Sequence, residues 1–210
     1  MHVRLQRRQG NCFIDVDFQN DESGIAALFG PSGAGKSSVI NMVAGLMKPA
    51  WGSIHIRGRC LFDSVRGIDL PPEKRNVGYV FQEGFLFPHL SIKGNLLYGR
   101  RRGDQSGGID FDQVVDLLDI RRLLPRKPKN LSCGEKQRVA FGRAVLSKPD
   151  ILLMDEPLAS LDEARKEEML PFIKDLNAHF SIPILYVSHS LEEILVLTDS
   201  IIKLANGKIV

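Results

Sequence analysis

The residues best suited to chemistry lie together in one short segment, residues 30–38. The segment reads GPSGAGKSS and fits the pattern G-x-x-x-x-G-K-[ST]. Glycines at this spacing let successive backbone N–H groups surround a phosphate without a Cβ atom in the way. Lys36 offers a compact positive charge to the outer phosphates, and the Ser37 hydroxyl can bind Mg²⁺. The segment predicts a nucleoside triphosphate site formed by Gly30, Pro31, Ser32, Gly33, Ala34, Gly35, Lys36, Ser37 and Ser38.

The flanking residues are of the types that would position this segment. The apolar run 25–29 predicts a buried strand that leads into it. An apolar stripe at helical spacing follows it and ends near 45–49, so the N-terminus of the helix would point at the anion. An ordinary glycine-rich turn is the alternative, but such a turn does not require a strand before it and a helix after it.

Two adjacent carboxylates could complete this chemistry. Asp155 and Glu156 directly follow the apolar run 151–154, which predicts a parallel core strand. A carboxylate at the end of such a strand can hold Mg²⁺ through water, and the next carboxylate can orient and deprotonate an attacking water molecule. An acidic turn after a strand is also common, and only the phosphate-binding segment favours the catalytic interpretation.

A second potential anion site occurs at residues 131–138, LSCGEKQR. Ser132 and Glu135 have the spacing of a capping box that opens a helix. The same geometry exposes a helix N-terminus, a hydroxyl and the unobstructed N–H of Gly134, which together suit a γ-phosphate. Since the segment 30–38 already surrounds the phosphates from one side, a second anion-binding helix end indicates two chains that close over one nucleotide.

The composition is that of an ordinary globular protein. The chain has 210 residues, of which 43% are hydrophobic and 25% charged, and its net charge of +3 is too small to indicate nucleic-acid binding. Three scattered cysteines in no metal-binding spacing favour a reducing compartment. No stretch of the sequence approaches the roughly 18 apolar residues of a membrane span, so any function at a membrane would require a partner protein.

The predicted elements give an α/β fold with a mostly parallel sheet. Residues 2–18 and 53–57 alternate as half-exposed strands of a flanking antiparallel sheet, and residues 77–81 and 184–187 are buried core strands. Helices are predicted over 91–99, 111–119 and 162–179, with turns or loops at 21–24, 71–75 and 103–108 and a hairpin at Asn206-Gly207. We expect one domain, with a core formed by 1–82 and 148–210 and an inserted helical subdomain, 83–147.

The order of these motifs resembles an ATP-binding cassette (ABC) ATPase over the whole chain. One such match is weak, but six in order at the usual spacing are specific. The matching segments are Gly30–Ser37 (Walker A), Gln82 (Q-loop), Leu131–Glu135 (signature), Ile151–Glu156 (Walker B), Ser160–Asp162 (D-loop) and His189 (switch histidine).

The finer resemblance is to the ATPase subunit of bacterial molybdate importers. It is carried by PEKR at 72–75, GYVFQ at 78–82, LFPH at 86–89 and YVSHS at 186–190. Subunits of that family usually continue into a C-terminal oxyanion-binding domain, whereas this sequence stops at Val210. We therefore expect a truncated or atypical member.

The resemblance implies a role for each matching residue. Ser37, Gln82 and Asp155 would surround Mg²⁺, and Lys36 would neutralise the β- and γ-phosphate oxygens of ATP. Glu156 would be the general base, and His189 would contact the γ-phosphate. His189 also stands just before a second capping box, Ser190 with Glu193, so a histidine without chemistry at a helix start is the alternative. Across a dimer, the nucleotide would be contacted by Ser132, Gly134, Glu135 and Asp162.

Two positions depart from the family pattern or leave it unclear. Cys133 replaces the first of the two usual signature glycines; this would impair hydrolysis if the position needs a positive φ and would cost little if it is already helical. Phe13 is a candidate for the aromatic residue that stacks on adenine, and a plain role in strand packing is the alternative.

The resemblance also implies partners. These are a second ATPase subunit in a homodimer, membrane permease subunits docked near residues 83–98, and indirectly a periplasmic or extracellular solute-binding protein, with no nucleic acid. Buried packing within the helical insert is the alternative for 83–98. The chain would be peripheral, on the cytoplasmic face of the bacterial inner membrane. Import of sulfate, tungstate or iron, and a non-transport ABC ATPase, are the alternatives for function; a small-molecule kinase would not need residues 131–135 or Asp162.

Overall fold

The computed structural model describes residues 1–10, 12–20, 23–99 and 109–210. The strands are β1 (His2–Gln9), β2 (Cys12–Gln19), β3 (Ile25–Phe29), β4 (Trp51–Ile56), β5 (Arg59–Asp63), β6 (Ile68–Asp69), β7 (Val77–Val80), β8 (Ile151–Asp155), β9 (Ile184–Ser188), β10 (Ile201–Ala205) and β11 (Lys208–Ile209). The α-helices are α1 (Lys36–Ala44), α2 (Ile92–Leu97), α3 (Phe111–Leu117), α4 (Cys133–Leu146), α5 (Glu163–Phe180) and α6 (Leu191–Leu197). Short 3₁₀ helices cover Pro72–Lys74, Arg121–Leu123 and Pro128–Asn130.

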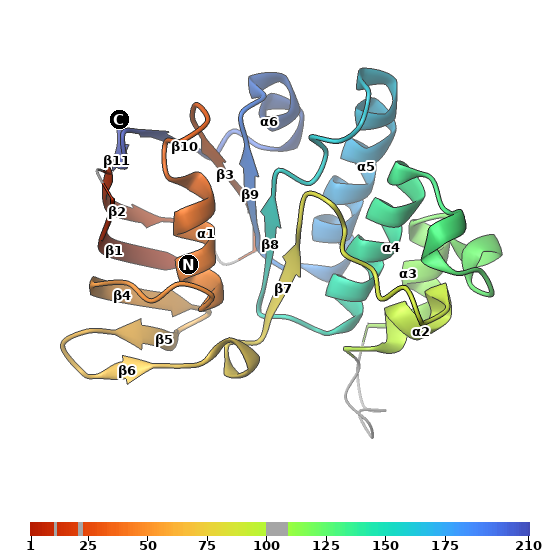
Figure 1. The fold of residues 1–210 in the computed structure, drawn as a ribbon, viewed down its shortest axis with the longest axis horizontal. Helices are drawn as coiled ribbons and strands as arrows, with labels where there is room; N and C mark the ends of the chain where they lie inside the picture. The colour runs from red at the N-terminus through yellow and green to blue at the C-terminus, as the bar shows by residue number, and fades with distance from the viewer. Residues whose placement is uncertain (11, 21–22, 100–108) are drawn as a thin grey trace.

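The described strands form an 11-stranded sheet in the order β6-β5-β4-β1-β2-β11-β10-β3-β9-β8-β7. From β10 to β7 all neighbours are parallel. From β6 to β2 all neighbours are antiparallel. The short strand β11 joins the two halves, since it pairs antiparallel with β10 and parallel with β2. This confirms the predicted α/β fold of a mostly parallel core with an antiparallel flank (Figure 1).

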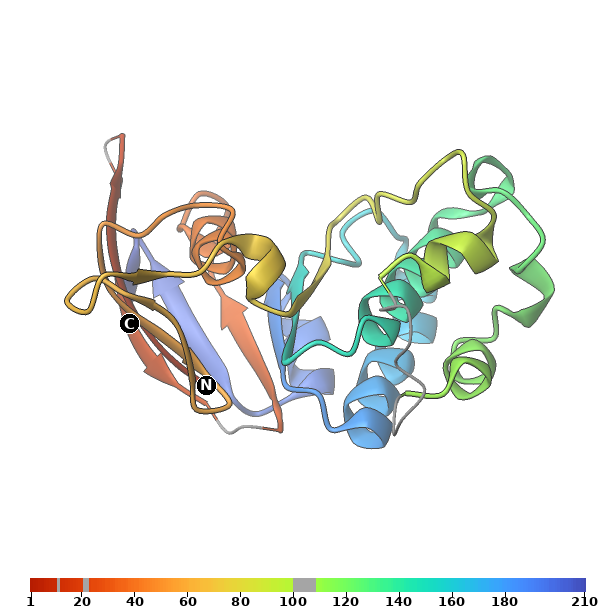
Figure 2. The same cartoon turned by 90° about the horizontal axis from the view of Figure 1, so that it is seen from below.

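The parallel strands are buried on both faces, as their uninterrupted apolar sequences predict. In β8, Leu153 packs with α1 and the antiparallel strands, whereas Leu152 and Met154 pack with the helices α2–α6. Strands β3 and β9 divide their residues in the same alternating way. Figure 2 shows the result, with the antiparallel strands at one end of the molecule and α2–α4 at the opposite end.

The half-exposed strand predicted over 2–18 is two strands that form a hairpin. The apolar residues of the first half, Val3 and Leu5, stand at odd positions, and those of the second half, Ile14 and Val16, at even positions. Successive side chains of a strand point to opposite faces, so a single strand could not bury both sets. The predicted loop 103–108 and part of the predicted turn 21–24 lie outside the described residues.

The hairpin predicted at Asn206-Gly207 is present, with positive φ at both residues (49° and 80°), as a type I′ turn requires. It packs against the phosphate-binding segment, because Gly207 N donates a hydrogen bond to the Ala34 carbonyl (3.0 Å). A Cβ atom on Gly30 would lie 2.1 Å from the Leu204 carbonyl oxygen. Only glycine fits at position 30 for this reason. The hairpin packs against the segment 30–38 and supports it.

Arg75, in the segment predicted as a loop, is almost completely buried beneath the end of α1. Its guanidinium donates hydrogen bonds to the Met42 and Val43 carbonyls (2.8 and 3.0 Å) and pairs with Asp69. A cation at a helix C-terminus satisfies free carbonyls and interacts favourably with the helix dipole. Arg75 thus fastens the helix that follows the phosphate-binding segment.

Candidate functional site

The segment 30–38 bridges β3 and α1 and curls around a cavity of about 520 Å³. Gly33 and Gly35 adopt φ values of 80° and 104°, which side-chain-bearing residues rarely adopt. The cavity is lined by Gln9, Cys12, Ile14, Ser32, Gly33, Gly35, Lys36, Ser37, Ser38, Gln82 and Glu156.

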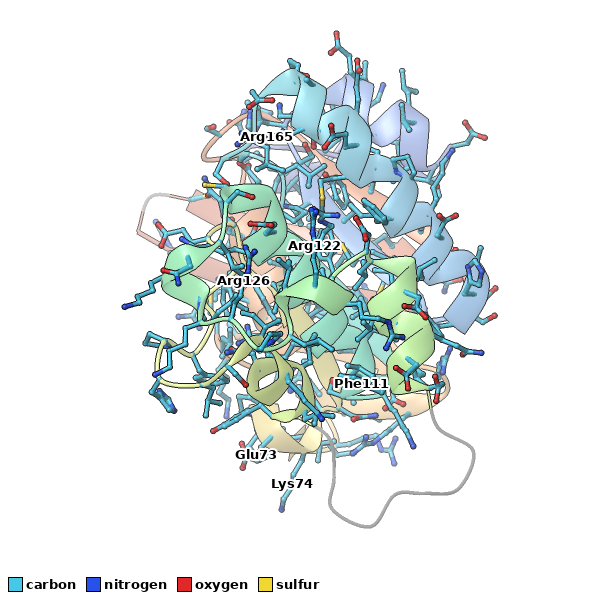
Figure 3. The ribbon with its side chains drawn as sticks, turned by 90° about the vertical axis from the view of Figure 1, so that its right-hand side faces the viewer. Glu73, Lys74, Phe111, Arg122, Arg126 and Arg165 are labelled. Carbon is cyan, nitrogen blue, oxygen red and sulfur yellow. The ribbon has the colours of Figure 1, made fainter. Side chains whose placement is uncertain are left out.

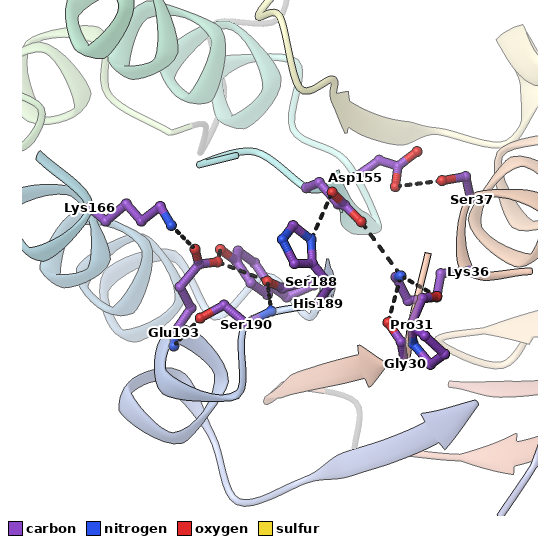
Figure 4. A network of polar contacts seen from close by, with 12 residues as sticks. Gly30, Pro31, Lys36, Ser37, Asp155, Lys166, Ser188, His189, Ser190 and Glu193 are labelled. Atoms are coloured by element: carbon purple, nitrogen blue, oxygen red, sulfur yellow. Dashed lines mark hydrogen bonds and ion pairs between the residues drawn. The ribbon is translucent and has the colours of Figure 1, made fainter. Parts of the chain in front are cut away.

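Lys36 is the buried cation of the site, with 4% of its side chain exposed. Its ammonium donates hydrogen bonds to the carbonyls of Gly30 (2.8 Å) and Pro31 (3.1 Å). It also lies 3.5 Å from a carboxylate oxygen of Glu156. Figure 4 shows the Lys36 ammonium with Gly30 and Pro31. An ammonium held at a loop rich in N–H groups suits an anion better than an apolar ligand.

Ser37 and Asp155 meet as predicted, because the end of β8 lies beside the start of α1. The Ser37 hydroxyl donates to Asp155 Oδ1 at 3.1 Å, and the Tyr79 hydroxyl approaches Asp155 Oδ2 at 3.4 Å. Burial raises the pKa of Asp155, although the Ser37 hydrogen bond opposes the shift. Burial and the charge of Asp155 together raise the pKa of Tyr79, so its hydroxyl keeps its proton.

Glu156 sits between the phosphate-binding segment and His189. Its backbone has a φ of 46°, which is uncommon for a residue with a side chain, and its N–H donates to the Val187 carbonyl at 2.9 Å. One carboxylate oxygen faces Lys36, and the other lies 3.1 Å from His189 Nδ1. Because β8 and β9 are neighbours in the sheet, the residues just past their carboxyl ends come together here.

Gln82 lies two residues beyond the end of β7 and lines the cavity. Its position depends on a residue that the sequence did not single out, Gln137 of α4, which is 2% exposed. The Gln137 amide donates to the carbonyls of Phe81, Gln82 and Pro157. It thereby joins the segment carrying Gln82 to the segment that follows Glu156. The sequence offered one signal for Gln137, which is a polar residue on the apolar face of a predicted helix.

The helix end at Ser132 is formed as predicted but lies outside the 520 Å³ cavity. Ser132 Oγ accepts a hydrogen bond from Glu135 N (3.2 Å), and the Glu135 carboxylate accepts one from Ser132 N (2.8 Å). The Ser132 hydroxyl keeps its own proton for an anion, whereas Glu135 is engaged in the cap. A Cβ atom on Gly134 would meet nothing within 4 Å, so packing within this chain does not require glycine there.

Cys133 is already helical, because α4 begins at this residue and its φ is not positive. The position therefore does not need a positive φ, and a cysteine there costs the helix little. Asp162 caps the start of α5, where its side chain accepts a hydrogen bond from Arg165 N at 3.0 Å. Asp162 also lies outside the lining of the cavity.

Phe13 does not line the cavity, whereas its neighbours Cys12 and Ile14 do. Alternate residues of a strand point to opposite faces, and Phe13 lies on the opposite, exposed face of β2. The geometry gives no support to stacking of Phe13 on adenine, and Gln9 and Cys12 line the cavity instead.

The donor set fits a magnesium ion. The Ser37 hydroxyl lies within hydrogen-bond distance of the Asp155 carboxylate, and Ser37 and Gln82 line the same cavity. Their side-chain oxygens are hard donors of the kind that Mg²⁺ accepts beside phosphate oxygens. The described residues contain no cluster of three or more His, Cys, Asp or Glu side chains that could hold a metal by themselves.

These features coincide with a known sequence family. The family model described as "ABC transporter" matches residues 13–159. The chain belongs to this family. The chain is also 57% identical over 210 residues to the molybdenum import ATP-binding protein ModC of Paramagnetospirillum magneticum and 54% identical over 207 residues to that of Vibrio cholerae. It spans only 58% and 56% of the length of these two relatives.

Solved ABC proteins share the fold. The chain resembles cbiO1 of Clostridium perfringens, part of the ABC transporter complex cbiONQ, with a TM-score of 0.82, 21% identity, and coverage of 100% of this chain and 86% of cbiO1. It resembles the ATP-binding cassette MJ0796, solved as a dimer in a post-hydrolysis state with ADP and Pi, with a TM-score of 0.76, 27% identity, and coverage of 99% and 94%. The fold of the chain is thus that of an ABC ATPase.

Replacing Asp155 by asparagine is expected to stabilise the nucleotide-free protein and to slow strongly the Mg²⁺-dependent ATP hydrolysis proposed for this site. A buried carboxylate whose pKa is raised destabilises the folded state as pH rises from near 3.8, the ordinary value, through the higher folded value. Asparagine removes this cost and still accepts the Ser37 hydrogen bond. We expect a higher melting temperature at pH 7 and a rate lower by about a hundredfold or more. A lower melting temperature in calorimetry would contradict the assigned cost of burial.

Proposed function

We propose that this chain is the ATP-hydrolysing subunit of an ABC importer and that the imported solute is molybdate. One observation supports the hydrolytic part: Ser37 contacts Asp155, and Glu156 contacts both Lys36 and His189. These are the residues proposed to bind phosphate, hold the metal and accept the proton. The identity of more than half of the chain with molybdenum import proteins supports the solute.

The proposed mechanism is positioning combined with charge neutralisation. The backbone N–H groups of 30–38 and the Lys36 ammonium hold the β- and γ-phosphates of ATP. Ser37, Gln82 and Asp155 would hold Mg²⁺, which supplies further neutralisation of phosphate charge. Glu156 accepts a proton from the attacking water, and its contact with His189 keeps the carboxylate oriented.

The proposed site is completed by a second copy of the chain. Ser132, Gly134 and Asp162 are exposed or half-exposed and lie outside the cavity of their own chain. In a homodimer they would contact the nucleotide held by the partner, while Glu135 shapes the helix end through its cap. The dimeric state of the similar cassette MJ0796 supports this arrangement. We also propose one domain, in which 1–82 and 148–210 form the core and 83–147 the helical subdomain.

Residues 83–98 are proposed to dock the permease. Phe85 and Tyr98 are 57% and 63% exposed, whereas Leu86 packs against the core. The Phe87 and Tyr98 rings lie 4.2 Å apart, and the Phe85 ring contacts Phe81 at 5.3 Å. Figure 3 shows this end of the molecule, where Arg122 and Arg126 project outward from the connection between α3 and α4.

None of the helices in the described ranges combines the length and apolar character that a bilayer-spanning helix needs. The similarity to molybdenum import proteins supports the proposed location, which is peripheral and on the cytoplasmic face of the bacterial inner membrane, where ATP is available. A solute-binding protein on the other side would act through the permease.

Reconstitution tests this proposal. The purified chain, combined in proteoliposomes with the membrane subunit encoded beside it and the matching solute-binding protein, should hydrolyse ATP with Mg²⁺, and molybdate should stimulate the rate. Stimulation by sulfate but not by molybdate or tungstate would refute the proposed solute. Absence of ATP turnover in the intact complex would refute the proposed enzyme.

A further inference from the structure

A buried carboxylate outside the site holds the turn that carries His189. Glu193 of α6 has only 8% of its side chain exposed, and none of the catalytic roles above involves it. Its Oε2 atom accepts hydrogen bonds from the Tyr186 hydroxyl (2.8 Å) and the Ser188 hydroxyl (2.9 Å). Its Oε1 atom lies 3.2 Å from the Lys166 ammonium of α5. Three donors from two other elements therefore converge on one carboxylate.

The same contacts fix both neighbours of His189. Ser188 Oγ donates to Glu193 and accepts a hydrogen bond from Ser190 N at 3.0 Å. Ser190 Oγ in turn accepts from Glu193 N at 3.3 Å. The turn from 188 to 190 is thus bonded to Glu193 through its side chain and its backbone, and the His189 ring extends from this turn toward Glu156 (Figure 4).

Lys166 extends this network to the start of α5. It stands one turn after Asp162, and Lys166 N donates to the Asp162 carbonyl at 3.0 Å. Its ammonium bridges Glu193 and Glu163, a residue whose side chain is 77% exposed. A buried ion pair adds little stability over apolar packing. The Lys166–Glu193 pair therefore matters more because it orients the turn 188–190 than because of its strength.

We propose that Glu193 is a positioning residue for ATP hydrolysis: it orients His189 toward Glu156 through Ser188 and Ser190, and Lys166 ties this turn to the helix that begins at Asp162. This inference rests on the proposed function, because His189 has a role in catalysis only if ATP is hydrolysed here. It also links the residue proposed to contact the partner's nucleotide, Asp162, with the histidine that contacts the chain's own nucleotide.

The test compares steady-state hydrolysis by the dimeric protein for wild type, Glu193→Gln, Lys166→Met and Glu163→Gln. Glutamine keeps the shape and an acceptor oxygen but loses the ion pair, so kcat should fall about tenfold while KM for ATP changes by less than about twofold. Lys166→Met should lower kcat by about threefold, and the matched control Glu163→Gln, which removes only the exposed partner of Lys166, should retain the wild-type rate.

A second background separates positioning from general loss of structure. In His189→Ala protein, adding Glu193→Gln should lower kcat no further, because the residue through which Glu193 acts is gone. A wild-type kcat in both Glu193→Gln and Lys166→Met would overturn the inference, as would an equal further loss in the His189→Ala background. If Glu193→Gln does not fold, Lys166→Met carries the comparison. An inactive wild type would instead refute the proposed function itself.

Discussion

Replacing Glu156 by glutamine is expected to lower kcat for ATP hydrolysis by about a hundredfold or more, because an amide cannot accept the proton of the attacking water. ATP binding should persist. The backbone of 30–38 and Lys36 hold the phosphates independently of Glu156, and the amide is close in size to the carboxylate. Removing a negative charge 3.5 Å from the Lys36 ammonium should even favour the bound triphosphate.

The measurement pairs a phosphate-release assay with binding of a fluorescent ATP analogue. Sedimentation in the presence of ATP should show dimers that accumulate, since the nucleotide is no longer cleaved. Glu192→Gln, on the exposed face of α6, is the matched control and should behave as wild type. Undiminished hydrolysis by Glu156→Gln would remove Glu156 from the mechanism.

Replacing Ser132 by arginine is expected to lower hydrolysis by about a hundredfold or more while the same chain still binds ATP. The site of the change lies outside the cavity of its own chain, so we expect the effect on catalysis to act through the proposed contact with the partner's nucleotide. A long cation at an exposed helix end would clash with the facing segment 30–38 of the partner.

Two controls separate this effect from damage to α4. Ser132→Ala removes the same cap, at a cost of about 1 kcal/mol of stability, without adding bulk, and should retain more activity than the arginine variant. Ser23→Arg places the same cation before β3 and should not affect the rate. Normal hydrolysis by the Ser132→Arg chain alone would show that Ser132 has no role at the partner's site.

Much of the site was predictable because its functional residues lie in short sequence segments. The pattern at 30–38 is local, and the carboxyl ends of parallel strands meet at one edge of a sheet. Asp155 at the end of β8, Glu156 just after it and His189 just after β9 therefore had to lie near the segment that follows β3. Their contacts with Ser37, Lys36 and each other follow from that strand order.

The supporting residues were not predictable in the same way. Arg75, Gln137 and Glu193 act through partners distant in sequence or on another element, and a single polar residue in an apolar pattern does not name its partner. Tyr79 was interpreted as part of a buried strand, although its hydroxyl reaches Asn41 and Asp155. The orientation of Phe13, the candidate for stacking on adenine, was not predictable either, because the face on which it lies depends on the register of the β1–β2 hairpin.

The central claim, that two chains form one hydrolytic site, is tested most directly by mixing two inactive proteins. Chains with Lys36→Ala lack the cation, and chains with Ser132→Arg lack the helix end. In a mixed dimer one composite site carries both defects and the other carries neither. Hydrolysis should recover to about a quarter of the wild-type rate on random mixing. A rate no higher than the sum of the two separate proteins, with mixed dimers shown by native mass spectrometry, would contradict the account.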